Sequence, residues 1–390
     1  MQTSTLACAA LAALAACATA QAAPFLPASD DEVLEHVPVR SNELGAERAQ
    51  LAARPDDLDL AVRLAQQYVT QGRREADPRY YGRAQAVLAP WWSQAEPPVA
   101  VLRLRAQVLQ SKHDFDGALA DLDALLARTP HDADAWFMRA VIYEVRGEPE
   151  RALESCAPLW RLTDALSTTA CLASAASLSG RSEQSYALLA PMLERASDAS
   201  GETRAWALTV LAEIAARLGR DELADQHYRA ALAAAEPDQY SLSSYADFLL
   251  DRGRNEEVRA LLADRTQMDP LLLRLAIAAR RMHAPDAEAL GDALGERFAA
   301  LRARSDGSHL GNEARYELVL RGNAQRALEL ALTNFAVQRE PIDLRILLEA
   351  ALAAHEPAAA REALDWFTRS GLEDARIAAL ADRAKREAAL

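Results

Sequence analysis

Residues 101–130 read VLRLRAQVLQSKHDFDGALADLDALLARTP, and residues 132–162 read DADAWFMRAVIYEVRGEPERALESCAPLWRL. The two stretches repeat one pattern, because equivalent residues such as Ala106 and Ala140 lie 34 positions apart. Each stretch holds two runs with apolar residues at helical spacing, which predicts two amphipathic helices per unit. A fixed period of this length indicates an array in which each helix pair packs against its neighbours.

Small residues mark the places where the two helices of a unit approach each other most closely. Ala140 and Ala152 take these places in the second copy. A larger side chain there would overpack the contact, at a cost of about 1–3 kcal/mol. Gly147 lies where the first helix must end, a position that suits a residue free to take positive φ. The pattern resembles the tetratricopeptide repeat, whose signature places are held in this sequence by Pro130, Trp136, Ala140, Tyr143, Gly147 and Ala152.

This resemblance implies an all-α fold, an α-solenoid in which helix hairpins stack into a right-handed superhelix. The composition agrees, since 51% of the residues are hydrophobic and only 15 of 390 are glycine. We expect the superhelix to span residues 43–390 with about nine helix pairs, the last part, residues 372–390, being a capping helix. Pro285 stands at a turn position where the pattern expects glycine.

The first unit departs from the period. Residues 58–71 predict a helix, but Ala84 lies seven positions beyond the place that the repeat gives to its small residue. The residues between them, RREADPRYYG at 73–82, therefore predict an enlarged turn. A helix over residues 83–92 is expected to follow.

The N-terminal residues 1–22 predict a signal peptide. They carry no charged side chain, and their apolar run from Leu6 to Ala16 is too short to cross a membrane and is followed by small residues. Residues 23–42 are acidic and proline-bearing, without sustained periodicity, and predict a flexible lead-in. We therefore expect an exported, periplasmic protein.

Two processing routes remain open for this segment. Cleavage after Ala22 would follow an A-x-A site and release a soluble chain. Residues 14–17, LAAC, instead resemble a lipobox, which would make Cys17 the lipidated first residue of an outer-membrane lipoprotein facing the periplasm. Only this second route would anchor the protein to a membrane.

Cys156 and Cys171 are the cysteines beyond the signal segment. They lie 15 positions apart, on the second helix of one predicted unit and the first helix of the next. An exported chain permits a disulfide between them. Two buried free thiols that pack as small apolar residues are the alternative. The sequence leaves both open, because a disulfide depends on geometry.

The formal net charge of −14 argues against nucleic-acid binding, which needs a basic face, and against an anionic membrane surface. No other segment is apolar for long enough to span a membrane. The sequence has no G-x-S-x-G elbow, no phosphate-binding glycine loop and no H-E-x-x-H pair, and its seven histidines are far apart. It therefore predicts no catalytic residues, no metal site and no cofactor, and we expect a protein that is not an enzyme.

The resemblance also implies a binding surface, because the first helices of tetratricopeptide repeats line a concave groove that commonly holds a peptide or a helix of a partner. Transferring the family's groove positions onto this sequence gives Arg63, Gln66, Arg103, Gln107, Phe137, Val141, Glu144, Ser174, Glu213, Asp247 and Tyr316. The family's Lys and Asn pattern that clamps a terminal carboxylate is absent.

We therefore expect an exported, non-catalytic scaffold or adaptor that binds a protein or peptide partner in its groove. The alternative expectation is an outer-membrane lipoprotein, lipidated at Cys17, that serves as a scaffold for envelope assembly or secretion.

Overall fold

The computed structural model describes residues 42–303, 307 and 309–388, and no strand occurs within these ranges. The chain divides into two compact units, residues 1–49 and residues 50–390. The described part of the first unit is the beginning of helix α2 (Asn42–Ala53). The predicted signal peptide, Cys17 and the lead-in up to residue 41 lie outside the described residues.

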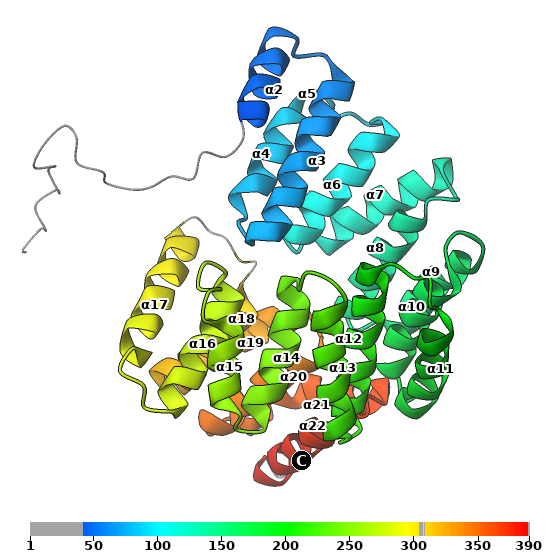
Figure 1. Cartoon of the computed structure of the whole chain (residues 1–390). Helices are drawn as coiled ribbons and strands as arrows, with labels where there is room; N and C mark the ends of the chain where they lie inside the picture. Colours follow the sequence, from blue (N-terminus) through cyan, green and yellow to red (C-terminus); the bar gives the residue numbers. More distant parts are fainter. Residues whose placement is uncertain (1–41, 304–306, 308, 389–390) are drawn as a thin grey trace, which may run out of the picture. The chain divides into compact units, whose positions relative to one another are not determined.

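Helices of the second unit follow one another as antiparallel hairpins (Figure 1). Within the described residues the nine pairs are α3 (Leu58–Glu75) with α4 (Arg79–Val87), α6 (Val99–Ser111) with α7 (Phe115–Arg128), α8 (Ala133–Val145) with α9 (Pro149–Cys156), α10 (Ala165–Ser177) with α11 (Ser182–Arg195), α12 (Gly201–Arg217) with α13 (Asp221–Ala234), α14 (Gln239–Asp251) with α15 (Asn255–Leu262), α16 (Asp269–Arg281) with α17 (Ala287–Ala303), α18 (Leu310–Tyr316) with α19 (Ala324–Phe335), and α20 (Pro341–Ala353) with α21 (Arg361–Ser370).

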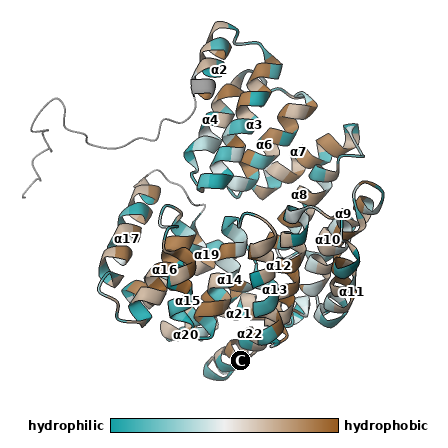
Figure 2. Cartoon of the chain, in the orientation of Figure 1, coloured by the Kyte–Doolittle hydropathy of each residue, from teal (hydrophilic) through white to brown (hydrophobic). Residues whose placement is uncertain are grey.

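Among the helices outside these pairs are α5 (Ala89–Trp92) after the first hairpin and α22 (Ala375–Glu387) after the last. Most helices carry both polar and apolar residues along the ribbon, as amphipathic helices must when one face packs on a neighbour (Figure 2). The expected all-α solenoid is confirmed. The final helix is shorter than expected, because Asp374 caps its first turn by accepting the backbone N–H groups of Arg376 and Ile377, both at 3.0 Å.

Each hairpin turn holds one residue in the left-handed helical region. Glycine fills five of these positions, and alanine or histidine fills the other four. In chain order they are Ala76, His113, Gly147, Gly180, Gly219, Gly253, His283, Gly322 and His355. A left-handed residue lets the next amide bond back to the end of the first helix. Thus the N–H of Glu148 donates to the carbonyl of Tyr143 at 2.8 Å.

This regularity corrects one expectation about the turns. Pro285 does not take the turn position; His283, with φ of 52°, does. Histidine tolerates this region better than most residues with a side chain. His113, His283 and His355 therefore have a structural place in the turns that the sequence pattern did not reveal.

The small residues expected between paired helices are buried. Ala106, Ala118 and Ala152 are 0% exposed and Ala140 is 1% exposed. A methyl group is the largest side chain that lets the paired backbones come this close, so this part of the repeat interpretation is confirmed.

The enlarged turn expected over residues 73–82 is wrong. Helix α3 continues to Glu75, and α4 starts at Arg79. Arginine and glutamate are good helix formers, so the extra residues lengthen both helices instead of forming a loop. Ala76 makes the turn with φ of 51°. Ala84, the small residue that seemed displaced, is 0% exposed as the repeat requires.

We predict that Ala76→Gly raises the free energy of unfolding by about 1 kcal/mol, because glycine avoids the strain of Cβ in the left-handed region. Ala86→Gly, at an exposed position of α4, is the matched control. There the same chemical change should lower stability by about 1 kcal/mol. Urea denaturation of both variants measures the difference. A loss of stability in Ala76→Gly would contradict the assignment of this turn.

Candidate functional site

The hairpin array turns back on itself, so that its last hairpin meets the third. The backbone N–H of Arg339 donates to the carbonyl of Val145 at 2.7 Å. The indole Nε1 of Trp366 donates to the carbonyl of Gly147 at 3.3 Å. We call these contacts, together with the bond from the N–H of Ser182 to Oε2 of Glu373 at 2.9 Å, the closure contact.

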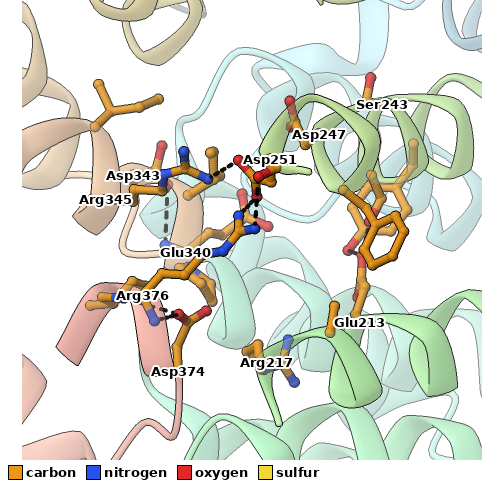
Figure 3. Close-up of a pocket in the computed structure, with 18 of the residues that line it drawn as sticks. Glu213, Arg217, Ser243, Asp247, Asp251, Glu340, Asp343, Arg345, Asp374 and Arg376 are labelled. Carbon is orange, nitrogen blue, oxygen red and sulfur yellow. Dashed lines mark hydrogen bonds and ion pairs between the residues drawn. The ribbon is translucent and has the colours of Figure 1, made fainter. Parts of the chain in front are cut away.

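Behind the closure contact lies a cavity of about 700 Å³. Residues of the first helices α8, α10, α12 and α14 line one side, and residues of α18, α20 and α22 line the other. Charged side chains from both sides line it, among them Glu213, Asp251 and Arg376 (Figure 3). The concave face of the middle hairpins is therefore covered by the C-terminal helices of the same chain.

Asp247 binds two arginines from the next two hairpins. Its two carboxylate oxygens accept from Arg274 and Arg315, each at 2.5 Å. The side chains of these arginines are only 8% and 7% exposed. Burial tends to raise the pKa of Asp247, but the two guanidinium groups outweigh it and hold the pKa below its ordinary value. This residue lines the cavity, yet both its oxygens are engaged in holding α14, α16 and α18 together.

Asp251, one turn further along α14, joins that helix to the C-terminal helices. Its carboxylate accepts from Arg345 of α20 at 2.7 Å and pairs with Arg376 of α22. Figure 3 shows both arginines converging on it. These ion pairs bridge 94 and 125 positions of sequence between Asp251 and its partners.

Three carboxyl groups at the cavity lack such arginine partners. Glu144 accepts from Oγ of Ser174 at 2.8 Å, and Glu213 accepts from the hydroxyls of Tyr240 at 2.7 Å and Ser244 at 2.8 Å. Glu340 stands at the first turn of α20, in a capping box with Asp343. Burial raises the pKa of Glu144 to about 7 and also raises the pKa values of Glu213 and Glu340.

The structure separates the predicted groove residues into two groups. Glu144, Ser174, Glu213 and Asp247 meet at the cavity. The other members on α3, α6 and α8 do not line it: Arg63 and Gln66 are exposed, Arg103, Gln107 and Phe137 are half-buried, and Val141 is 42% exposed.

Two predicted groove residues are engaged within the fold. Tyr316 is 3% exposed and packs against the ring of Phe298 at 5.3 Å between centroids, so its assignment to the groove is wrong. Tyr316 belongs to the same apolar cluster as Leu294 and Phe298 of α17, which takes its ring into the core. The guanidinium group of Arg103 is also engaged, because it pairs with Asp132 and Asp134.

Sequence reasoning missed the residues that the C-terminal helices bring to the cavity, above all Glu340, Arg345 and Arg376. A repeat pattern describes contacts between neighbouring hairpins and carries no signal for contacts between hairpins far apart. One local signal was present, since Glu340 followed by Pro341 and Asp343 is a helix-start pattern.

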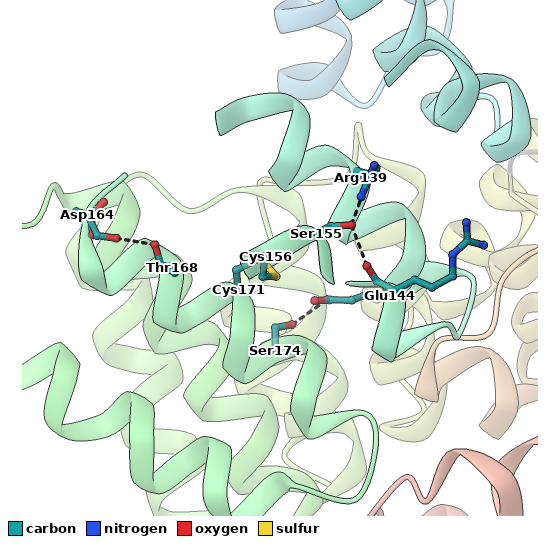
Figure 4. Close-up of a disulfide and its surroundings, with 9 residues drawn as sticks. Arg139, Glu144, Ser155, Cys156, Asp164, Thr168, Cys171 and Ser174 are labelled. Carbon is teal, nitrogen blue, oxygen red and sulfur yellow. Dashed lines mark hydrogen bonds between the residues drawn. A yellow bond between two sulfur atoms is a disulfide. The ribbon is translucent and has the colours of Figure 1, made fainter. Parts of the chain in front are cut away.

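A disulfide joins Cys156 to Cys171 and so links α9 to α10, the adjoining helices of successive hairpins (Figure 4). Of the two alternatives that the sequence leaves open, the structure has the bonded one. Both cysteines are buried, at 0% and 3% exposed. Ser174, which binds Glu144, lies one turn along α10 from Cys171. The disulfide therefore fixes two hairpins whose inner faces border the cavity.

Across the described ranges, no three or more His, Cys, Asp and Glu side chains gather in an arrangement that could hold a metal ion. Nor is any helix in the described part of the chain long and apolar enough to cross a membrane.

Comparisons with known proteins support the repeat interpretation. The sequence model of the tetratricopeptide repeat matches residues 103–157, the segment from α6 to α9. The hairpins outside this segment keep the same order of first helix, left-handed turn residue and second helix. Residues 103–157 therefore contain tetratricopeptide repeats, and the other described hairpins continue the same all-α repeat architecture.

Solved structures are similar along most of the chain, at low identity. The likeness to the tetratricopeptide-repeat domain of P58(IPK) is 15% identical, covers 85% of this chain and 98% of that one, and has a TM-score of 0.24. Yeast Tom70 is 13% identical, with 89% and 96% covered and a TM-score of 0.21. The likeness to the structure of Naa15/Naa10 bound to HypK-THB is 16% identical, covers 88% of this chain and 55% of that one, and has a TM-score of 0.28. At these TM-scores the likenesses carry no argument about function. A comparison with curated proteins finds no match.

We predict that Asp247→Asn lowers the free energy of unfolding by about 3–5 kcal/mol, because it leaves Arg274 and Arg315 buried without a counter-charge. Asp123→Asn is the control, since Asp123 pairs with Arg139 at 2.9 Å but is 59% exposed. Its loss should cost less than about 1 kcal/mol. Equal losses in denaturant unfolding would contradict the structural role of Asp247.

Proposed function

We propose that this protein is an exported, non-catalytic scaffold that binds a segment of a partner protein on the inner face of its first three hairpins. The observation that carries the proposal is the contrast between two parts of that face. The C-terminal helices cover the middle hairpins, whereas α3 and α8 expose Arg63, Gln66 and Val141. Concave faces of solenoids are their usual binding surfaces.

The chemistry of this open face favours a mixed partner segment. Val141, at 42% exposed, offers an apolar anchor, and Phe137 lies one turn before it on α8. Phe137 is held by Trp206, whose ring meets it edge-on at 5.6 Å between centroids. A rigid aromatic next to an exposed apolar side chain is typical of a binding hot spot. Arg63 and Gln66 add charge and hydrogen bonding at the N-terminal end of the face.

Export is supported by two independent features. Residues 1–22 have the composition of a signal peptide, and the disulfide between Cys156 and Cys171 suits an oxidising compartment such as the periplasm. The alternative function, a lipoprotein scaffold for envelope assembly or secretion, is favoured by the lipobox-like residues 14–17.

The substitution Cys17→Ser distinguishes these two versions. If the chain is cleaved after Ala22, Cys17 is discarded and the substitution leaves the protein in the periplasmic fraction unchanged. If Cys17 is lipidated, wild type sediments with the outer membrane and Cys17→Ser does not. Fractionation followed by intact-mass measurement of the mature chain reads both outcomes; a mature chain that keeps residues 1–16 would contradict export by either route.

We predict that Val141→Arg weakens partner binding by at least about tenfold, because it replaces the apolar anchor by a charge. The control is Leu188→Arg, which makes the same change at a residue of α11 that is 53% exposed. A photo-crosslinking residue placed at position 141 or 188 identifies the partner, and titration with the captured partner gives the affinities. Equal capture at both positions, or equal affinity of both arginine variants, would overturn the proposed surface.

A further inference from the structure

The closure contact is made mainly by the backbone of hairpin turns. A Cβ atom added to Gly180 would lie 3.1 Å from the carbonyl oxygen of Gly371. One added to Gly147 would lie 2.7 Å from the ring of Trp366. The third and fourth hairpins thus meet the end of the chain at two glycine turns, with Trp366 packed on Gly147 and Leu178 packed against the apolar residues of the last hairpins. Such a contact can part without disrupting the packing inside either hairpin.

Like charges face one another across the cavity behind this contact. Glu340 of α20 interacts electrostatically with Glu144 of α8 and Glu213 of α12, and each disfavours ionisation of the others. Arg217 of α12 is the cation that interacts with both Glu144 and Glu213, and it donates to Ser177 at 2.6 Å. Glu144 and Glu213 therefore share one guanidinium group, whereas the charges that act on Glu340 are those of other carboxyl groups.

The other titratable groups around the three carboxyls are accounted for. Tyr240 of α14 donates a hydrogen bond from its hydroxyl to Glu213. Asp343 accepts from Asn334 at 2.8 Å. Tyr228 also interacts with Glu213. The remaining carboxylates of the lining are held in ion pairs or a helix cap, the arginines of the lining include their partners, and two imidazoles border the cavity; these groups are Asp221, Asp247, Asp251, Asp374, Arg252, Arg274, Arg315, Arg345, Arg376, His113 and His309.

We propose that the last hairpin and α22 close reversibly over the inner face of the middle hairpins, and that the protonation of Glu144, Glu213 and Glu340 controls this closure. With neutral carboxyls the closed form is stable. When the carboxyls ionise, repulsion across the cavity loosens the closure contact and uncovers the middle of the inner face. The use of that uncovered face by a partner rests on the proposed function, but the closure itself does not.

The sign of the pH dependence follows from the pKa shifts. In the closed form burial raises the pKa of Glu144 from 4.5 to about 7, and burial together with Asp343, Glu213 and Glu144 raises that of Glu340. In the open form these groups return toward their ordinary values. The closed form thus binds more protons, and its stability falls as pH rises from about 4.5 through 7. The ion pairs of Asp251 with Arg345 and Arg376 oppose opening.

Amide hydrogen exchange of the full chain tests closure directly. The N–H groups of Arg339 and Ser182 donate across the closure contact, whereas those of Arg220 and Arg254 donate within their own hairpins, at 2.8 and 3.0 Å. From pH 5.5 to 8.5 we expect protection factors at the first two, corrected for intrinsic rates, to fall at least about tenfold, since each unit of pKa difference is a factor of ten. The protection factors of Arg220 and Arg254 should change less than about twofold. A constant ratio between the two sets would overturn the proposal.

Two sets of variants test the carboxyl cluster and the closure contact separately. E144Q/E213Q removes two of the charges, so at pH 8.5 the protection of Arg339 should be at least about fivefold higher than in wild type. Gly180→Ala should lower the protection of Arg339 at pH 5.5, whereas Gly219→Ala should not. Both glycines have positive φ, 75° and 73°, but Gly219 has open space around it.

Equal protection in the two glycine variants would show that the closure contact does not form in solution. Unchanged pH dependence in E144Q/E213Q would show that the carboxyl cluster does not control it. Neither readout uses a partner, so failure of the proposed binding surface would leave these results intact.

Discussion

The structure depends on one repeated constraint, the close approach of two helices across a turn that a left-handed residue makes. An alanine such as Ala140 or Ala152 lets the backbones come together, and Gly147 lets the chain reverse. Each hairpin then has two apolar faces to cover, and its neighbours cover them. Because the same step recurs, successive hairpins rotate in the same sense, and the array turns until its end meets the third hairpin.

That return decides what the inner face can do. In the middle of the array the face is occupied by α20 and α22, which Asp251 binds through Arg345 and Arg376. The cavity that remains is lined by half-buried carboxyls of raised pKa, so closure brings like charges to one cavity. Arg63 and Gln66 of α3 and Val141 of α8 lie outside this closure and stay exposed. One chain thus combines an exposed part of the inner face with a covered part.

The sequence predicted the features that depend on contacts between adjacent helices. The period of 34 located the helix pairs, and alanines such as Ala106 marked their contacts. The predicted helix boundaries and turn residues were less accurate. The extra residues before Ala84 lengthened two helices, and His283 took the turn in place of a glycine. The site was predicted only in part. Glu144 and Glu213 were identified from family positions, but Glu340 reaches them through a return of the whole array, which no repeat pattern encodes.

The most direct test of this account is intramolecular crosslinking between the ends of the closure. A photoreactive amino acid in place of Trp366, whose indole contacts the carbonyl of Gly147, would be activated at pH 5.5 and the products mapped by mass spectrometry. The account predicts a crosslink within one chain to residues 145–149. This segment includes Gly147, which lies 219 positions before residue 366. Crosslinks confined to neighbouring hairpins, or formed only between chains, would contradict it.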